Sequence, residues 1–251
     1  MTNQQQLLIG SEKQSERYLI NFLNNCWLGC WLTKSFFKGL EYNHFLSFYS
    51  MIKAIIFDLG GVIIFNELNV ILKKFADELK IDFEKLKEVE LENHEKLLLG
   101  KISIKEFCSS IRSRFNLEQD SLTLLLVWER IYSENAKLNG ELIEKIKLIR
   151  KKFKVGAVSN MFDSTAQFHQ RQRLFLFFKP NLAISCRIGF TKSDIKLYAK
   201  VISAMQVKGN ECLFVDDKEK NLVMAKEFGM KTLLFSDNKK LFKELKKLKI
   251  I

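Results

Sequence analysis

The stretch "IIFDLGGVII", residues 55–64, decides how the rest of the chain is interpreted. Its apolar run ends in a carboxylate, Asp58, and two glycines follow shortly after. This pattern is typical of a buried strand that ends in a turn. A lone acid at the end of a buried strand indicates a functional role. Position 60, where a second acid would complete a familiar pair, is a glycine. The stretch therefore raises the question of whether its active site works, is altered or has been lost.

The bulk composition is ordinary for a soluble globular protein. The chain has 251 residues, 47% of them hydrophobic and 28% charged, which is enough for one large domain or a core with a smaller insert. No apolar run approaches the ~18–20 residues that a membrane helix needs, and the first residues lack the basic region of a secretory signal. The net charge is +12, but the lysines are spread along helix-like segments, which favours solvated helix faces. We therefore expect neither a membrane nor a nucleic-acid partner, and the oligomeric state stays open.

The cysteines indicate a reducing compartment. There are five, and Cys26 and Cys30 have no partner pair at zinc spacing, so buried or free thiols are expected. Cys212 lies in a strand-like run, where cysteine acts as a small hydrophobic residue. This usage predicts a cytoplasmic location.

Residues 1–50 differ from the rest of the chain. They are rich in Asn, Gln and aromatic residues, and their apolar residues recur with neither a helical nor a strand period. A clear strand pattern begins at Met51 with "MIKAIIFD". We expect either that Met51, rather than Met1, is the natural start or that residues 1–50 are a loosely packed extension.

From Met51 the chain alternates between strand-like and helix-like segments. The strands are expected at residues 53–58, 154–159, 181–186, 212–217 and 231–235, and the helices between them at 140–153, 163–175, 193–205 and 219–229, with a Lys-rich helix at the end. Near-continuously apolar strands that alternate with helices predict an α/β fold: a Rossmann-like parallel sheet with helices on both faces. Residues 66–133 repeat apolar side chains at helical spacing and are too long for a simple crossover. We therefore expect a core of residues 51–65 and 134–251, with residues 66–133 as an inserted α-helical cap.

Polar side chains stand where several of these strands end. In open parallel sheets, ligands bind beyond the carboxyl ends of the strands. The side chains expected at that edge are Asp58, Ser159, Asn160, Lys192, Asp216 and Asp217. Each one alone is typical of a turn, a helix cap or a solvated surface. Together, in this order and at equivalent strand ends, they predict one site.

The segments "FDLGGV", "VSN", "TKSD" and "VDDKEKN" resemble, in this order, the four motifs of the haloacid dehalogenase superfamily, a large group dominated by phosphatases. The resemblance covers residues 51 to about 235 and includes the helical insert, which falls where many members carry a cap. The motif "FDLGG" resembles the first motif of a subgroup that includes sugar-phosphate phosphatases. The resemblance implies a Mg²⁺-dependent phosphatase that hydrolyses a small phosphorylated metabolite, such as a sugar phosphate, through an aspartyl-phosphate.

The resemblance also implies a role for each motif residue. Asp58 attacks phosphorus as the nucleophile. Ser159 and Asn160 donate hydrogen bonds to phosphate oxygens, and Lys192 neutralises developing charge as a point cation. Asn221 is expected to orient the acidic pair. The implied ligands of Mg²⁺ are the carboxylates of Asp58, Asp216 and Asp217 and the main-chain carbonyl of Gly60.

Two positions depart from the family pattern. Gly60 stands where most phosphatases of this family carry the Asp that protonates the leaving group, and such help is typically worth ~10²–10⁴-fold. We therefore expect weaker turnover of alkyl phosphates than of anomeric, acyl or aryl phosphates, and Glu67 is a candidate substitute for the missing acid. Ser193 replaces the usual Pro after the motif Lys. Pro is preorganised for the start of a helix and Ser is also a good helix cap, so we expect the change to be neutral to mildly loosening.

Two alternatives to the phosphatase stay open. Haloacid dehalogenases of the family also lack an acid at the position of Gly60 and also use Ser-Asn in the second motif. They need no metal, however, and would give Asp216 and Asp217 little role. A non-catalytic relative that binds a phosphorylated ligand is the second alternative, because of Gly60 and Ser193.

Nothing in residues 66–133 names the substrate, which cap residues are expected to select. Glu92, His94 and Glu95 resemble metal ligands or a specificity cluster, but we interpret them as part of a solvated helix face.

Overall fold

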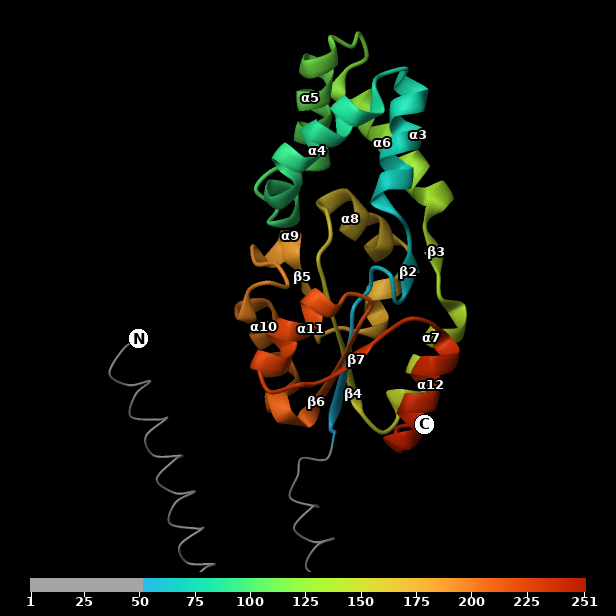
Figure 1. Cartoon of the computed structure of the whole chain (residues 1–251), viewed down its shortest axis with the longest axis vertical. Helices are drawn as coiled ribbons and strands as arrows, with labels where there is room; N and C mark the ends of the chain where they lie inside the picture. Colours follow the sequence, from blue (N-terminus) through green and yellow to red (C-terminus); the bar gives the residue numbers. More distant parts are fainter. Residues whose placement is uncertain (1–51) are drawn as a thin grey trace, which may run out of the picture. The chain divides into compact units, whose positions relative to one another are not determined.

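The computed structural model describes residues 52–251 (Figure 1). The expectations for residues 1–50, for the start at Met1 or Met51 and for Cys26 and Cys30 lie outside the described residues. Within residues 52–251, no helix is both long enough and apolar enough to cross a membrane.

The core is a five-stranded parallel sheet with the strand order β5-β4-β1-β6-β7. At its centre, Phe57 of β1 pairs with Ala157 of β4 and Val215 of β6, so these three strands end at the same edge. The predicted α/β fold with a parallel sheet is confirmed. The strands are β1 (Ala54–Phe57), β4 (Lys154–Ser159), β5 (Leu182–Ile184), β6 (Cys212–Asp216) and β7 (Lys231–Leu234).

Helices cover both faces of the sheet because successive residues of a strand point to opposite sides. Ile55 and Phe57 of β1 join a buried cluster with side chains of α7 and α12, whereas Ala54 and Ile56 join a cluster with side chains of α10 and α11. Burial of each large apolar side chain stabilises the fold by roughly 1.5–3 kcal/mol. The helices of the core are α7 (Gly140–Ile149), α8 (Asp163–Arg171), α9 (Ser185–Ile188), α10 (Ile195–Met205), α11 (Glu219–Glu227) and α12 (Asn238–Lys247).

Four further helices form a packed group of their own between β1 and α7, which we call the helical unit. They are α3 (Leu68–Leu79), α4 (Phe83–Leu98), α5 (Ile104–Phe115) and α6 (Ser121–Asn135). Their core centres on Trp128, whose ring meets Phe75 and Phe107 edge to face, at centroid distances of 5.5 and 6.0 Å. The chain enters the unit through β2 (Ile64–Phe65) and returns through β3 (Lys137–Leu138), which pair antiparallel. The domain boundaries at residues 66 and 133 stay a prediction.

The helical unit lies beyond the carboxyl ends of the strands, where α8 contacts it (Figure 1). The backbone N–H of Ile104 in α5 donates to Asp163 Oδ1 at the start of α8, at 3.0 Å. Tyr132 Oη of α6 lies 2.6 Å from His169 Nε2 of α8. Burial lowers the pKa of His169 to about 4, so its imidazole is neutral at pH 7. These contacts hold the helical unit over the edge of the sheet where β4 ends.

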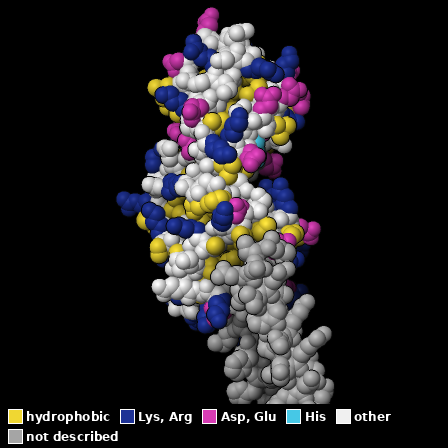
Figure 2. Space-filling model, turned by 90° about the vertical axis from the view of Figure 1, so that its left-hand side faces the viewer, with side chains coloured by type: hydrophobic (Ala, Val, Ile, Leu, Met, Phe, Trp, Pro, Cys, Tyr) yellow, Lys and Arg dark blue, Asp and Glu magenta, His cyan; other side chains and the backbone are white. Residues whose placement is uncertain are grey.

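Charged side chains are spread over the surface of the described residues. On the face that carries α4, α9 and α10, Lys and Arg side chains occur throughout, with Asp and Glu among them chiefly on the helical unit (Figure 2). The ion pairs between Lys and acidic side chains one helical turn apart, such as Lys147–Glu144 at 2.6 Å, are largely solvent-exposed and contribute little to stability.

The structure differs from the expected elements at three places. The helix expected at 163–175 ends at Arg171, and a separate 3₁₀ helix follows at Leu174–Phe177, after Arg173 in a left-handed conformation. The strand expected at 181–186 covers only Leu182–Ile184, since α9 begins at Ser185. A second 3₁₀ helix (Gly209–Glu211) and the strands β2 and β3 were not expected, because elements of two or three residues carry no period.

Candidate active site

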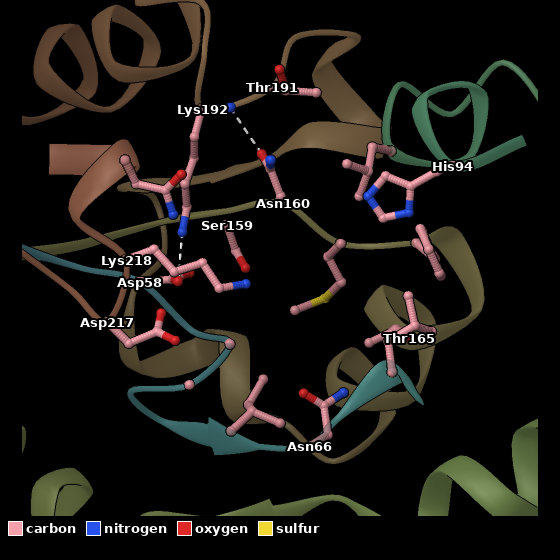
Figure 3. Close-up of a pocket in the computed structure, with 18 of the residues that line it drawn as sticks. Asp58, Asn66, His94, Ser159, Asn160, Thr165, Thr191, Lys192, Asp217 and Lys218 are labelled. Carbon is pink, nitrogen blue, oxygen red and sulfur yellow. Dashed lines mark hydrogen bonds and ion pairs between the residues drawn. The ribbon is translucent and has the colours of Figure 1, made fainter. Parts of the chain in front are cut away.

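Lys192 forms the centre of a buried ion-pair network at the edge of the sheet (Figure 3). Its Nζ lies 2.5 Å from Asp58 Oδ2 and 2.7 Å from Asp216 Oδ2. Asp58 directly follows β1 and Asp216 ends β6, so the neighbouring strands bring these carboxylates together. Only 3% of Lys192 is exposed, and a buried ammonium is tolerated because it is paired on both sides.

Two residues hold the backbone of Lys192 in place. Asn160, just after β4, accepts the N–H of Lys192 at its Oδ1, at 2.9 Å. The Tyr198 hydroxyl, from α10, donates to the Lys192 carbonyl at 3.1 Å. The amide oxygen of Asn160 is therefore engaged in positioning Lys192, and its expected hydrogen bond to phosphate stays a prediction.

Asp58, Asp216 and Asp217 form a cluster of three carboxylates. One oxygen from each lies within 4.8 Å of the other two. Asn221 Nδ2 donates to Asp216 Oδ1 at 2.9 Å, so Asn221 orients the first acid of the pair. Asp217 Oδ1 is buried and has no hydrogen-bond partner among residues 52–251. Buried polar atoms are normally satisfied, so this oxygen points to a missing cation or donor.

The close approach of the first motif to Asp217 explains the glycine at position 61. A Cβ on Gly61 would lie 2.3 Å from Asp217 Oδ2, and the φ of +79° is one that side chains rarely adopt. Gly60 is different, because a Cβ there would meet no atom within 4 Å beyond its chain neighbours. The backbone therefore leaves room for a side chain at position 60, although the sequence supplies none.

The charges at this edge are unbalanced. Burial raises the pKa of Asp58 to about 7; Lys192 opposes this shift, and Asp216 adds to it. The pKa of Asp217 is also raised, by burial and by Asp216. Burial lowers the pKa of Lys192, but the two carboxylates outweigh burial and raise it overall. Three carboxylates face one buried ammonium, and the cluster therefore suits an additional cation.

A pocket of about 600 Å³ lies between this edge and the helical unit. Ser159, at the end of β4, is 1% exposed and lines the pocket, and its hydroxyl has no hydrogen-bond partner among the described residues. Asp216 is fully buried behind Lys192 and does not line the pocket. The other residues expected at the site all line it: Asp58, Gly60, Ser159, Asn160, Lys192 and Asp217.

Three residues or groups near the site behave differently from what the sequence alone suggests. Ser193 does not cap the helix that follows it, since the cap of α10 is Asp194, which accepts the N–H of Lys196 at 2.9 Å. Glu67 is exposed at the start of α3 and does not line the pocket, so it is no substitute for the missing acid. Glu92 and Glu95 are exposed, as expected of a solvated helix face, but His94 and Glu95 also line the pocket, which that interpretation did not include.

The fold and the order of these residues along the chain define a class of hydrolases. Residues 52–229 match the haloacid dehalogenase-like hydrolase family. The chain belongs to this family, and the resemblance seen in the sequence is confirmed.

Relatives and solved structures agree with this assignment. The bifunctional epoxide hydrolase 2 of Sus scrofa is 22% identical over 214 residues, which are 78% of this chain and 38% of that protein. The D-ribitol-5-phosphate phosphatase of Bacteroides thetaiotaomicron is 25% identical over 201 residues, 72% of this chain and 91% of that protein. The chain thus matches only 38% of the length of the porcine relative.

Two solved structures share the fold. A HAD family enzyme of Bacteroides thetaiotaomicron, in complex with magnesium and inorganic phosphate, superposes with a TM-score of 0.65 at 20% identity, over 76% of this chain and 99% of that one. A HAD-like family hydrolase of Porphyromonas gingivalis gives a TM-score of 0.67 at 21% identity, over 79% of this chain and 98% of that one. At these identities the likeness establishes the fold alone.

Proposed function

We propose that this chain is a Mg²⁺-dependent phosphatase that hydrolyses a small phosphorylated metabolite through an aspartyl-phosphate on Asp58. One observation carries the proposal: Asp58 faces Lys192 at the wall of the pocket, beside the unpartnered hydroxyl of Ser159. The relative that is a D-ribitol-5-phosphate phosphatase, and the structural neighbour solved with magnesium and phosphate, support the same reaction class.

The carboxylate cluster fits Mg²⁺. This cation prefers carboxylate and carbonyl oxygens, and Asp217 Oδ1 is a buried carboxylate oxygen without a partner within residues 52–251. Asp58, Asp217 and the main-chain carbonyl of Gly60 would hold the ion, with Asp216 beside or behind them. When bound, the ion supplies positive charge that keeps the Asp58 carboxylate ionised and neutralises the phosphate oxygens.

The remaining chemistry falls to the protein's own residues. A carboxylate oxygen of Asp58 bonds to phosphorus as the bond to the leaving oxygen breaks. Lys192 Nζ and Ser159 Oγ donate to the oxygens of the phosphoryl group, whose charge they offset. Water then attacks phosphorus, the bond between phosphorus and the Asp58 oxygen breaks, and inorganic phosphate leaves while the proton of the water passes to the phosphate or to solvent. Gly60 contributes no acid, so the leaving oxygen departs without a carboxylate donor at that position.

We also propose that residues 66–133 are a cap that shapes the substrate pocket. The helical unit has its own hydrophobic core, and side chains of α3, α4 and α6 line the pocket opposite Asp58. Of the two alternatives, a dehalogenase is less well supported, because halide removal needs no metal and leaves the three-carboxylate cluster without a role.

Hydrolysis of p-nitrophenyl phosphate with and without Mg²⁺ tests the proposed function. We expect turnover with Mg²⁺ and a loss of about 100-fold or more with EDTA, because the cation contributes several kcal/mol of charge stabilisation. Excess Mg²⁺ should restore the rate. No hydrolysis of aryl or sugar 1-phosphates at high enzyme concentration would contradict the proposal. Metal-free release of chloride from 2-chloropropionate would favour the dehalogenase, and binding of beryllofluoride with Mg²⁺ but no turnover would favour a non-catalytic binder.

The Gly60→Asp variant tests the missing acid. The position has room for the side chain, so we expect the fold to accept it. Turnover of alkyl phosphates should rise by about 10–100-fold, and turnover of p-nitrophenyl phosphate by less than about threefold, since a nitrophenolate needs little protonation. Gly60→Asn is the matched control, because it has the same size without the acid. Equal changes for both substrates would show that protonation does not limit the reaction.

A further inference from the structure

The two walls of the pocket differ in charge. The basic residues that line it, Lys192, Lys218 and Lys220, all come from the sheet side. Its lining residues from the helical unit include no Lys or Arg. They are His94, Glu95 and five apolar or aromatic residues: Leu68, Ile71, Leu98, Trp128 and Tyr132. Figure 3 shows His94 across the cavity from Asp58, Lys192 and Lys218. The sheet side also carries Asp58 and Asp217, whose charge the proposed cation would offset, so its three lysines suit an anion; the helical side, which carries Glu95, does not.

His94 is held in place by a buried carboxylate one helical turn away. Glu90 is 5% exposed, and its Oε1 lies 2.5 Å from His94 Nδ1. The imidazole of His94 also contacts Phe162. The two rings pack edge to face, with their centroids 5.8 Å apart. A buried carboxylate costs free energy unless it is paired, so Glu90 fixes His94 strongly. This pair plays no part in the chemistry at Asp58 described above.

Glu90 engages Nδ1, so among residues 52–251 the Nε2 of His94 has no hydrogen-bond partner, and the side chain is 42% exposed. Nε2 accepts a hydrogen bond when the ring is neutral and donates one when it is protonated. A hydroxyl group suits both states, because it is a donor and an acceptor. An anion is disfavoured at this wall, because Glu95 lines it as well.

We infer that His94, positioned by Glu90, binds a hydroxyl of an uncharged leaving group, so that the substrate is the monophosphate of a neutral sugar or polyol. The inference rests on the proposed function, which places the phosphate against Asp58 and Lys192. The carbon skeleton then crosses the pocket beside the apolar side chains of Leu68, Ile71 and Leu98, and a distal hydroxyl reaches His94. His94 is a specificity residue for this reaction, and Glu90 is a positioning residue.

Two pairs of substrates test the class. Glucose 1-phosphate and glucuronic acid 1-phosphate share a leaving oxygen and differ in one CH₂OH or carboxylate group, as do sorbitol 6-phosphate and 6-phosphogluconate. With Mg²⁺ present, we expect kcat/KM to favour the neutral member by about tenfold or more in at least one pair, a difference of about 1.4 kcal/mol. No preference in either pair, or a preference for the acids, would overturn the inference.

The His94→Phe and Glu90→Gln variants test the residues. His94→Phe should raise KM for the better neutral sugar phosphate by about tenfold and leave kcat within about twofold, because one hydrogen bond to substrate is lost. Glu90→Gln should raise the same KM by a smaller factor. Hydrolysis of p-nitrophenyl phosphate, which has no hydroxyl to bind, should change much less than hydrolysis of the sugar phosphate in both variants, and an unchanged far-UV circular dichroism spectrum reports that they fold. Glu92→Gln, exposed on the same helix and outside the pocket, is the matched control.

The outcomes separate the two claims. Absence of p-nitrophenyl phosphate hydrolysis in the unaltered protein would defeat the proposed function. If the unaltered protein hydrolyses p-nitrophenyl phosphate but His94→Phe has an unchanged KM for neutral sugar phosphates, only the role of His94 would be overturned. The same holds if His94→Phe weakens both substrates equally, because a structural role would act on both.

Discussion

Replacement of Asp58 by Asn should abolish turnover, with kcat lower by about 10⁴-fold or more, as is usual when a nucleophile is removed. An amide does not form the covalent phosphoryl intermediate. The fold should survive, because Asn has nearly the same size and its amide oxygen can accept the Leu59 N–H that Asp58 Oδ1 accepts at 2.6 Å. Lys192 keeps its second partner, Asp216, at 2.7 Å.

Stopped-flow kinetics and intact-protein mass spectrometry would check this result. The unaltered protein should show a transient gain of the mass of one phosphoryl group, and Asp58→Asn should show none. Asp77→Asn is the matched control, because Asp77 is exposed on α3 and lies outside the pocket. Measurable steady-state turnover in Asp58→Asn at more than about 1% of the normal rate would exclude Asp58 as the nucleophile.

Replacement of Lys192 by Met should have the largest effect on stability. The ammonium is the buried cation between Asp58 and Asp216, and its loss leaves two buried carboxylates facing each other without compensation. Breaking a buried ion pair by removing one partner typically costs 3–5 kcal/mol, so we expect the free energy of unfolding to fall by about that amount. Turnover should fall by about 10²–10³-fold, as when one preorganised donor is removed from a site of developing charge.

Urea unfolding at pH 7, with and without Mg²⁺, would measure the stability effect. Mg²⁺ should stabilise Lys192→Met more than the unaltered protein, because the added cation offsets charge that the ammonium no longer offsets. Lys200→Met, at an exposed position on α10, should unfold like the unaltered protein. An unchanged free energy of unfolding in Lys192→Met would mean that Asp58 and Asp216 do not carry the charge assigned to them.

The part of the site that lies on the sheet could be predicted from the sequence. Asp58, Ser159 and Asp216 each stand where an apolar run ends, and a parallel sheet places such ends at one edge. The local signals ahead of α10 were less decisive. Ser193 and Asp194 are both good helix caps, and only the geometry of the Lys192 segment decides between them.

The part of the site that lies on the helical unit could not be predicted. His94 sits on an α-helix near the exposed residues Glu92 and Glu95, and this pattern is that of a solvated face. It lines the pocket only because α4 packs across the strand ends, and that packing depends on contacts far apart in sequence, such as Ile104 with Asp163. The prediction for Glu67 was wrong for the opposite reason, because Glu67 is close to Gly60 in sequence but does not line the pocket.

The pairing of β2 with β3 has a consequence for how this chain can be rebuilt. Ile64 and Leu138 are direct antiparallel partners, so the two ends of the helical unit are neighbours, and partners of this kind have Cα atoms about 4.5–5.5 Å apart. A two-residue hairpin turn spans that gap. The chain therefore enters and leaves the four helices through one narrow β2–β3 stem, so a gene in which they are replaced by a two-residue turn would leave every strand of the five-stranded sheet uncut.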